Sequence, residues 1–162
     1  YFSCSCQLLS IKRKATSIQN FLHSRRIMIV RLKKHHLQYF RNKARQTPNE
    51  IYAFLIGTRI SPTLIQIERF RYPKLTMSTP ALVVADVDSE VEIEDIAKLN
   101  NYTIVGSLHS HPNYITPMSD CDLSTLKNSS HTVSGVLGII GDKTFITFWC
   151  RDTPLPATIQ FF

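Results

Sequence analysis

Two histidines separated by one residue, followed further on by a serine and an aspartate, form the most restrictive pattern in the chain. Residues 109–122 read HSHPNYITPMSDCD. Within this segment, the candidates for metal ligands are His109, His111 and Asp122. Imidazole nitrogens and carboxylate oxygens are common zinc ligands, and a site with three protein ligands keeps one coordination position open for water. The segment therefore predicts a catalytic zinc centre, provided that the fold brings its two ends together.

A buried strand is predicted to lead into the two histidines. Residues 102–109 read YTIVGSLH, which is apolar and partly β-branched. Because side chains alternate between the faces of a strand, His109 and His111 project to the same side, about 7 Å apart along the chain. Pro112 ends this strand, since it has no N–H to donate to a neighbouring strand.

The aspartate lies where a helix is expected to begin. In the segment SDCDL, Ser119 occupies the N-cap position and Asp122 the third position of the helix. A helix packed beneath the strand end would present the Asp122 carboxylate as a third zinc ligand. An ordinary capping pair is the alternative explanation for Ser119 and Asp122.

The motif HSHPx6SxxD resembles the signature of the JAMM zinc metalloproteases, the catalytically competent MPN (JAB) domains. That family also has a glutamate before an apolar strand that ends in glycine, and the segment PNEIYAFLIG, with Glu50, is similar to it. The resemblance extends over about residues 28–150. It implies an α/β fold of the JAB/MPN type, which is cytidine-deaminase-like: a curved mixed β-sheet flanked by helices.

The same resemblance implies a role for each residue of the motif. His109, His111 and Asp122 correspond to the ligands of Zn²⁺. Glu50 corresponds to the general base that takes a proton from the attacking water and passes it to the leaving amine. Ser119 corresponds to the residue that stabilises the oxyanion. The implied reaction is hydrolysis of an amide or isopeptide bond at the C-terminus of a ubiquitin-like or sulfur-carrier-like protein, as in a deubiquitinase.

Other functions remain open at this point. One is a zinc peptidase that acts on a small peptide adduct, or on a cell-wall or phage peptide. Only 40 residues follow Asp122, so the long second insertion of the ubiquitin-chain-specific members is expected to be missing. Another is a non-catalytic MPN scaffold or nucleic-acid-binding module, although scaffold members usually lack a metal ligand. We expect no nucleic-acid partner, and the oligomeric state is left open.

Charge divides the chain into two parts. Residues 1–46 contain 11 Lys or Arg and no acid, whereas residues 47–162 contain 8 basic and 12 acidic residues. We interpret residues 1–27 as a basic extension outside the domain and residues 28–162 as the metalloprotease domain. A functional basic arm is the alternative for the first part. No apolar run reaches the 18 residues of a membrane span, and the cysteines are expected to be reduced, so we predict a cytoplasmic protein.

Periodicity predicts the remaining elements. An apolar stripe of Leu37, Phe40 and Ala44 indicates a helix over 33–46 with a basic outer face. A second helix is expected over 90–100, capped by Ser89, and residues 71–80 are expected to form a flexible loop. A third helix is predicted over 120–128, and strands are predicted over 51–57, 63–70, 133–140, 143–150 and 156–161.

Overall fold

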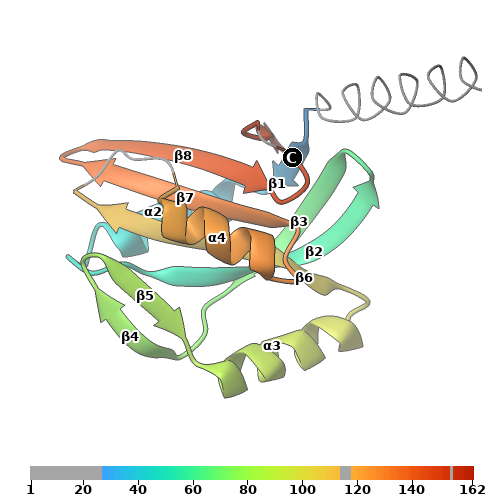
Figure 1. Ribbon diagram of the computed structural model, residues 1–162, viewed down its shortest axis with the longest axis horizontal. Coiled ribbons are helices and arrows are strands. Elements are labelled where there is room, and N and C mark those ends of the chain that lie inside the picture. The colour runs from blue at the N-terminus through green and yellow to red at the C-terminus, as the bar shows by residue number, and fades with distance from the viewer. Residues whose placement is uncertain (1–26, 114–117, 154) are drawn as a thin grey trace, which may run out of the picture.

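The computed structural model describes residues 27–113, 118–153 and 155–162. Its centre is a mixed seven-stranded sheet in the order β8-β7-β6-β2-β3-β1-β9 (Figure 1). The strands are β1 (Ile29–Leu32), β2 (Tyr52–Ser61), β3 (Leu64–Arg71), β6 (Thr103–Pro112), β7 (Val133–Ile140), β8 (Lys143–Cys150) and β9 (Thr158–Phe161). The predicted α/β architecture is confirmed, and the predicted extension lies outside the described residues except for Ile27.

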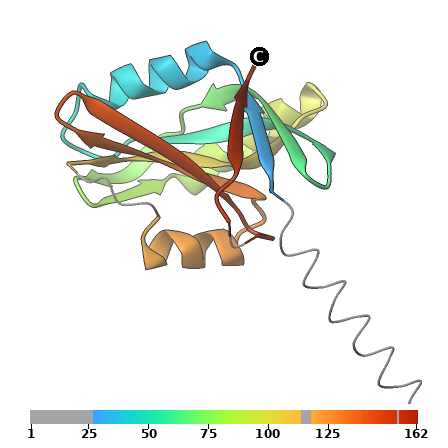
Figure 2. The same ribbon diagram turned by 90° about the horizontal axis from the view of Figure 1, so that it is seen from above.

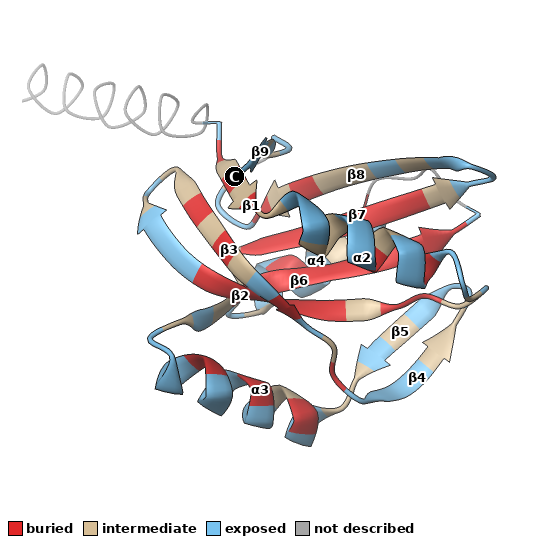
Figure 3. Cartoon of the chain, turned by 180° about the vertical axis from the view of Figure 1, so that it is seen from behind, coloured by how far each residue is buried: buried red, intermediate tan, exposed pale blue. Residues whose placement is uncertain are grey.

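The central strand β6 carries both histidines. It pairs antiparallel with β2 and parallel with β7, so it has neighbours on both edges. From Val105 to Pro112 every residue of β6 is buried, which Figure 3 shows as an almost continuous band. Pro112 is the last residue of the strand, as predicted. The two histidines thus lie at the end of a strand that is almost entirely enclosed.

Helices cover both faces of the sheet. Helix α2 (Lys34–Ala44) packs Phe40 and Ala44 into the largest core cluster. Because neighbouring residues of a strand face opposite sides, the packing partners of α3 (Val87–Leu99) and α4 (Asp120–Asn128) place these two helices on the other face. Figure 2 shows α2 (blue) and α4 (orange) on opposite sides of the sheet. In the described part of the chain, none of the helices has the length and apolar character needed to cross a membrane.

The prediction of a loop over residues 71–80 was wrong. Residues Leu75–Thr79 form β4, which pairs antiparallel with β5 (Leu82–Ala85) in a separate two-stranded sheet. Prolines at 73 and 80 flank β4 and obscured it, because proline is typical of turns and strand ends. A turn at Gly141-Asp142 joins β7 and β8, and Gly141 has the positive φ of 52° that glycine adopts easily.

The prediction that Ser89 caps the second helix was also wrong. Helix α3 begins at Val87, and Asp86 is its N-cap: the Asp86 carboxylate accepts a hydrogen bond of 3.0 Å from the backbone N–H of Ser89. The Ser89 hydroxyl instead accepts a hydrogen bond from the backbone N–H of Lys74. Aspartate and serine cap helices about equally well, so propensity alone does not distinguish them.

Replacing Asp86 by alanine is expected to lower the free energy of unfolding by about 1 kcal/mol, because the first turn of α3 loses its side-chain acceptor. Urea denaturation followed by circular dichroism measures the change. Asp88→Ala is the control, since Asp88 lies in the first turn without capping it. Equal losses in the two variants would show that the helix dipole, rather than the cap, stabilises this end of α3.

Candidate metal centre

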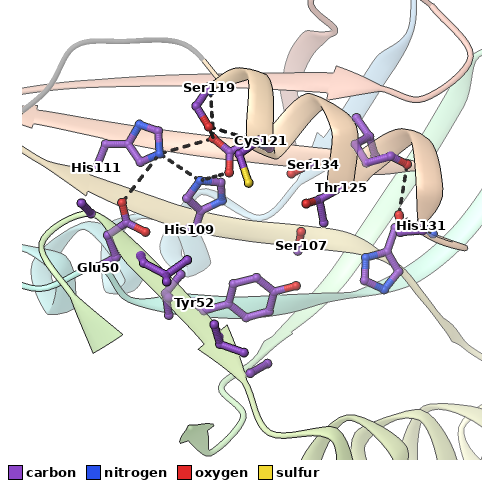
Figure 4. A pocket seen from close by; sticks show the side chains of 18 of the residues that line it. Glu50, Tyr52, Ser107, His109, His111, Ser119, Cys121, Thr125, His131 and Ser134 are labelled. Atoms are coloured by element: carbon purple, nitrogen blue, oxygen red, sulfur yellow. Dashed lines mark hydrogen bonds and ion pairs between the residues drawn. The ribbon is translucent and has the colours of Figure 1, made fainter. Parts of the chain in front are cut away.

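The alternation of β6 brings the two histidines together on one face. The Nε2 atoms of His109 and His111 lie 3.0 Å apart, and the ring centroids are separated by 4.9 Å (Figure 4). Both residues are buried. The intervening Ser110 faces the opposite side of the strand, which is what the period of two requires. The two imidazoles therefore lie on one face of the strand, as expected from the sequence, and they converge.

The third candidate ligand comes from α4. Oδ1 of Asp122 lies 3.3 Å from Nε2 of His109, and Oδ2 lies 3.6 Å from Nε2 of His111. The ligand atoms of the three residues all lie within 4.8 Å of one another. Two imidazole nitrogens and one carboxylate oxygen at this separation fit the donor set of a zinc ion with an open coordination position. His109, His111 and Asp122 could thus hold a metal ion.

A capping box orients the Asp122 carboxylate. The backbone N–H and the hydroxyl of Ser119 donate to Oδ2 of Asp122 at 2.8 and 2.6 Å, and the backbone N–H of Asp122 donates to Oγ of Ser119 at 3.2 Å. Burial alone would raise the pKa of Asp122. The hydrogen bond and charge of His109, together with the bonds from Ser119, outweigh it and hold this pKa well below its usual range. Asp122 is therefore an ionised carboxylate, the form that binds metals.

Glu50 lies beside this group, two residues before the start of β2. Its Oε1 is 3.8 Å from Nε2 of His111, and only 6% of the residue is exposed. Burial raises the pKa of Glu50 to about 7, an effect that His109 partly opposes and the charge of Asp122 reinforces. A carboxyl group that titrates near neutral pH can both accept and release a proton, which suits a general acid–base catalyst.

The β4–β5 hairpin holds the backbone of Glu50. The N–H of Glu50 donates to the carbonyl of Thr79 at 2.8 Å, and the hydroxyl of Ser78 donates to the carbonyl of Glu50 at 2.9 Å. The side-chain amide of Asn49 donates to the carbonyl of Ser78. These contacts were not predicted from the sequence, because residues 71–80 were expected to form a loop. The alternation of apolar and polar residues in LTMST, the sequence of β4, was the signal that could have revealed the strand.

All five residues singled out from the sequence line one groove of about 720 Å³. Strand β5 borders it on one side and α4 on the other, and it continues past Tyr52 to Glu90 and His131 (Figure 4). Three carboxylates line it, those of Glu50, Glu90 and Asp122, and no Lys or Arg is found among its described lining residues. Tyr52, Glu90 and His131 were not expected from the sequence, because single residues of these types carry no recognisable pattern.

Comparisons with known proteins show the family and the fold of this chain. The model of a family described as prokaryotic homologs of the JAB domain matches residues 32–151. The solution structure of protein DSY2949 from Desulfitobacterium hafniense superposes with a TM-score of 0.70 at 20% identity, over 82% of this chain and 92% of that one. AF2198, a JAB1/MPN domain protein from Archaeoglobus fulgidus, superposes with a TM-score of 0.52 at 12% identity, over 84% and 98%. No curated protein matches in sequence. At these identities the two structures are evidence for the fold alone.

Proposed function

The chain belongs to the family of prokaryotic homologs of the JAB domain, and from this premise we propose that it is a zinc-dependent peptidase that hydrolyses amide or isopeptide bonds. The observation that carries the proposal is the position of Glu50. A buried carboxyl group with a pKa of about 7 lies 3.8 Å from His111, a member of the His-His-Asp group that could hold a metal. A site that only stored a metal would gain nothing from such a group.

Each side chain has a defined task in this reaction. A zinc ion held by His109, His111 and Asp122 would polarise the substrate carbonyl and acidify a water molecule. Glu50 takes a proton from the attacking water while the C–O bond forms, and returns it to the leaving nitrogen as the C–N bond breaks. The hydrogen bond from the backbone N–H of Ser119 keeps the Asp122 carboxylate oriented throughout.

Ser119 has a second proposed task. Its hydroxyl proton is donated to Oδ2 of Asp122, so it is committed to the capping box. We propose that substrate binding turns this hydroxyl toward the developing oxyanion. The backbone N–H of Ser119, which also donates to Oδ2 of Asp122, preserves the cap while the hydroxyl is turned away.

The groove favours an extended peptide as substrate. Strand β5 borders it and belongs to a sheet of only two strands, so an extended chain can add to its edge through backbone hydrogen bonds. We propose that the C-terminal tail of a ubiquitin-like or sulfur-carrier-like protein lies there, with its last peptide or isopeptide bond at the metal centre. The carboxylates that line the groove favour a tail without acidic side chains near the scissile bond.

Two alternative functions would use different surfaces of the molecule or different substrates. A peptidase that trims a small adduct or a cell-wall peptide would use the same groove, and a panel of carrier fusions and free peptides separates it from the proposed substrate class. A nucleic-acid-binding module would use the basic face of α2, which lies on the other side of the sheet from α4 (Figure 2). Binding of DNA that weakens steeply with salt would favour the latter.

The purified protein is expected to contain about one zinc ion per chain, as in sites with three protein ligands. His111→Ala should lose both the metal and hydrolysis, because only two of the three protein ligands, His109 and Asp122, remain. Mass spectrometry of the metal content measures the stoichiometry. His35→Ala is the control, since His35 is an exposed histidine on α2. Wild-type protein that binds no zinc at neutral pH would refute the proposed function.

A further inference from the structure

Ser110, between the two histidines, has no part in the proposed chemistry, yet it is fully buried with 0% of its surface exposed. Its side chain points away from the metal centre, because successive residues of β6 alternate between the faces of the sheet. It makes two hydrogen bonds with one residue. The N–H of Ser110 donates to the carbonyl of Ile51 at 3.0 Å, and the N–H of Ile51 donates to Oγ of Ser110 at 3.0 Å.

These two bonds lie where the pairing of β2 with β6 stops. The last paired residues are Tyr52 and His109. Continuing the antiparallel register by one residue places Ile51 opposite Ser110, and by two residues it places Glu50 opposite His111. In a regular ladder Ile51 would donate to the backbone carbonyl of Ser110. Here the hydroxyl accepts that bond instead, so a side chain continues the strand pairing where the backbones diverge.

The residue whose position depends on these two bonds is Glu50, the neighbour of Ile51. Glu50 immediately precedes Ile51 in the chain, and its carboxyl group lies 3.8 Å from Nε2 of His111. On its other side, Ser78 and Thr79 of β4 hold its backbone. Glu50 is thus held between β6 and the β4–β5 hairpin. Of these two supports, the one from Ser110 connects it to the strand that carries both histidines.

We propose that Ser110 is a positioning residue, which sets the distance between the base Glu50 and the metal ligands by clamping the backbone of Ile51. The proposal rests on the proposed function for its kinetic consequence, whereas the clamp itself is a property of the fold. A displacement of a catalytic group by about 1 Å can cost about 100-fold in rate, so a clamp next to the base has a measurable effect on kcat.

Three variants test the proposal. Ser110→Ala removes the acceptor of the Ile51 N–H, and Ser110→Thr retains a hydroxyl on Cβ. Ser61→Ala is the matched control, because the hydroxyl of Ser61 also accepts a backbone N–H, that of Thr63 at 3.3 Å, at the far end of the same strand β2. Zinc content, kcat, KM and the hydrogen exchange of the Ile51 amide are measured for each purified protein.

Ser110→Ala is expected to retain zinc and to keep KM within about twofold, while kcat falls by about 10- to 100-fold. The Ile51 amide should exchange about tenfold faster, because its hydrogen bond is lost. Ser110→Thr should restore both kcat and slow exchange, and Ser61→Ala should leave both unchanged.

Several results would overturn the proposal. Unchanged kcat and exchange in Ser110→Ala would show that the bond positions nothing. Loss of zinc in that variant would show that Ser110 supports the histidines rather than the base. If the Ile51 amide exchanges slowly in Ser110→Thr but kcat does not recover, the hydrogen bond to Ile51 is not what supports catalysis. Should wild-type protein not hydrolyse any substrate, the proposed function fails, and the Ile51 exchange alone then decides whether Ser110 clamps the backbone.

Discussion

Glu50→Gln is expected to lower kcat by about 100- to 10,000-fold, the range typical of a lost general base. Glutamine has the shape of glutamate but cannot accept the proton of the attacking water. The metal should remain, since His109, His111 and Asp122 supply the donor atoms without it. Single-turnover cleavage of a carrier fusion, measured together with the zinc content of the same sample, separates the loss of chemistry from the loss of metal.

The control for this experiment is Glu92→Gln. Glu92 is an exposed residue of α3 and does not line the groove, so its replacement should leave the rate unchanged. Cleavage at the wild-type rate by Glu50→Gln would exclude Glu50 as the base. A variant that loses both zinc and activity would instead assign Glu50 to the metal-binding group.

Phe40→Ala is expected to cost about 3–5 kcal/mol of the free energy of unfolding, as for other large aromatic residues removed from cores. Phe40 has 0% of its surface exposed and anchors α2 to the sheet. Its ring packs against Phe70 and Tyr72, with centroids 6.2 Å away in each case. Alanine would leave a cavity at this contact, and denaturation in urea measures the loss.

Tyr39→Ala is the matched control, because the adjacent Tyr39 is 60% exposed and should cost less than about 1 kcal/mol. Since α2 and α4 lie on opposite faces of the sheet, the folded fraction of Phe40→Ala should keep its zinc. Two variants of equal stability would show that α2 contributes little to the core.

Local patterns were sufficient for much of the site. The common face of His109 and His111 follows from the alternation of a strand, which the backbone imposes whatever surrounds it. The capping box of Ser119 and Asp122 is similarly local, since its partners are three residues apart. Helix α2 was predicted from the spacing of Leu37, Phe40 and Ala44 for the same reason, because one apolar stripe suffices to bury a helix.

Local patterns failed where several residue types serve equally well. Serine and aspartate are interchangeable as helix caps, so the start of α3 was placed at Ser89 rather than at Asp86. Strand β4 was missed because prolines flank it and because the alternation of apolar and polar residues in LTMST extends over only five residues. The groove was not foreseen for a related reason: β5, α4 and the residues near His131 meet only in the folded chain.

The sequence by itself determined the donor set of the candidate metal centre and the local geometry of its two parts, because both depend on residues within one strand or one helical turn. Only the tertiary structure decided how these parts meet. The antiparallel pairing of β2 with β6 brings Glu50 to 3.8 Å from His111, and the packing of α4 against β7 brings Asp122 to the histidines. Strand register is set by side-chain packing across the whole sheet, so no single segment encodes these distances.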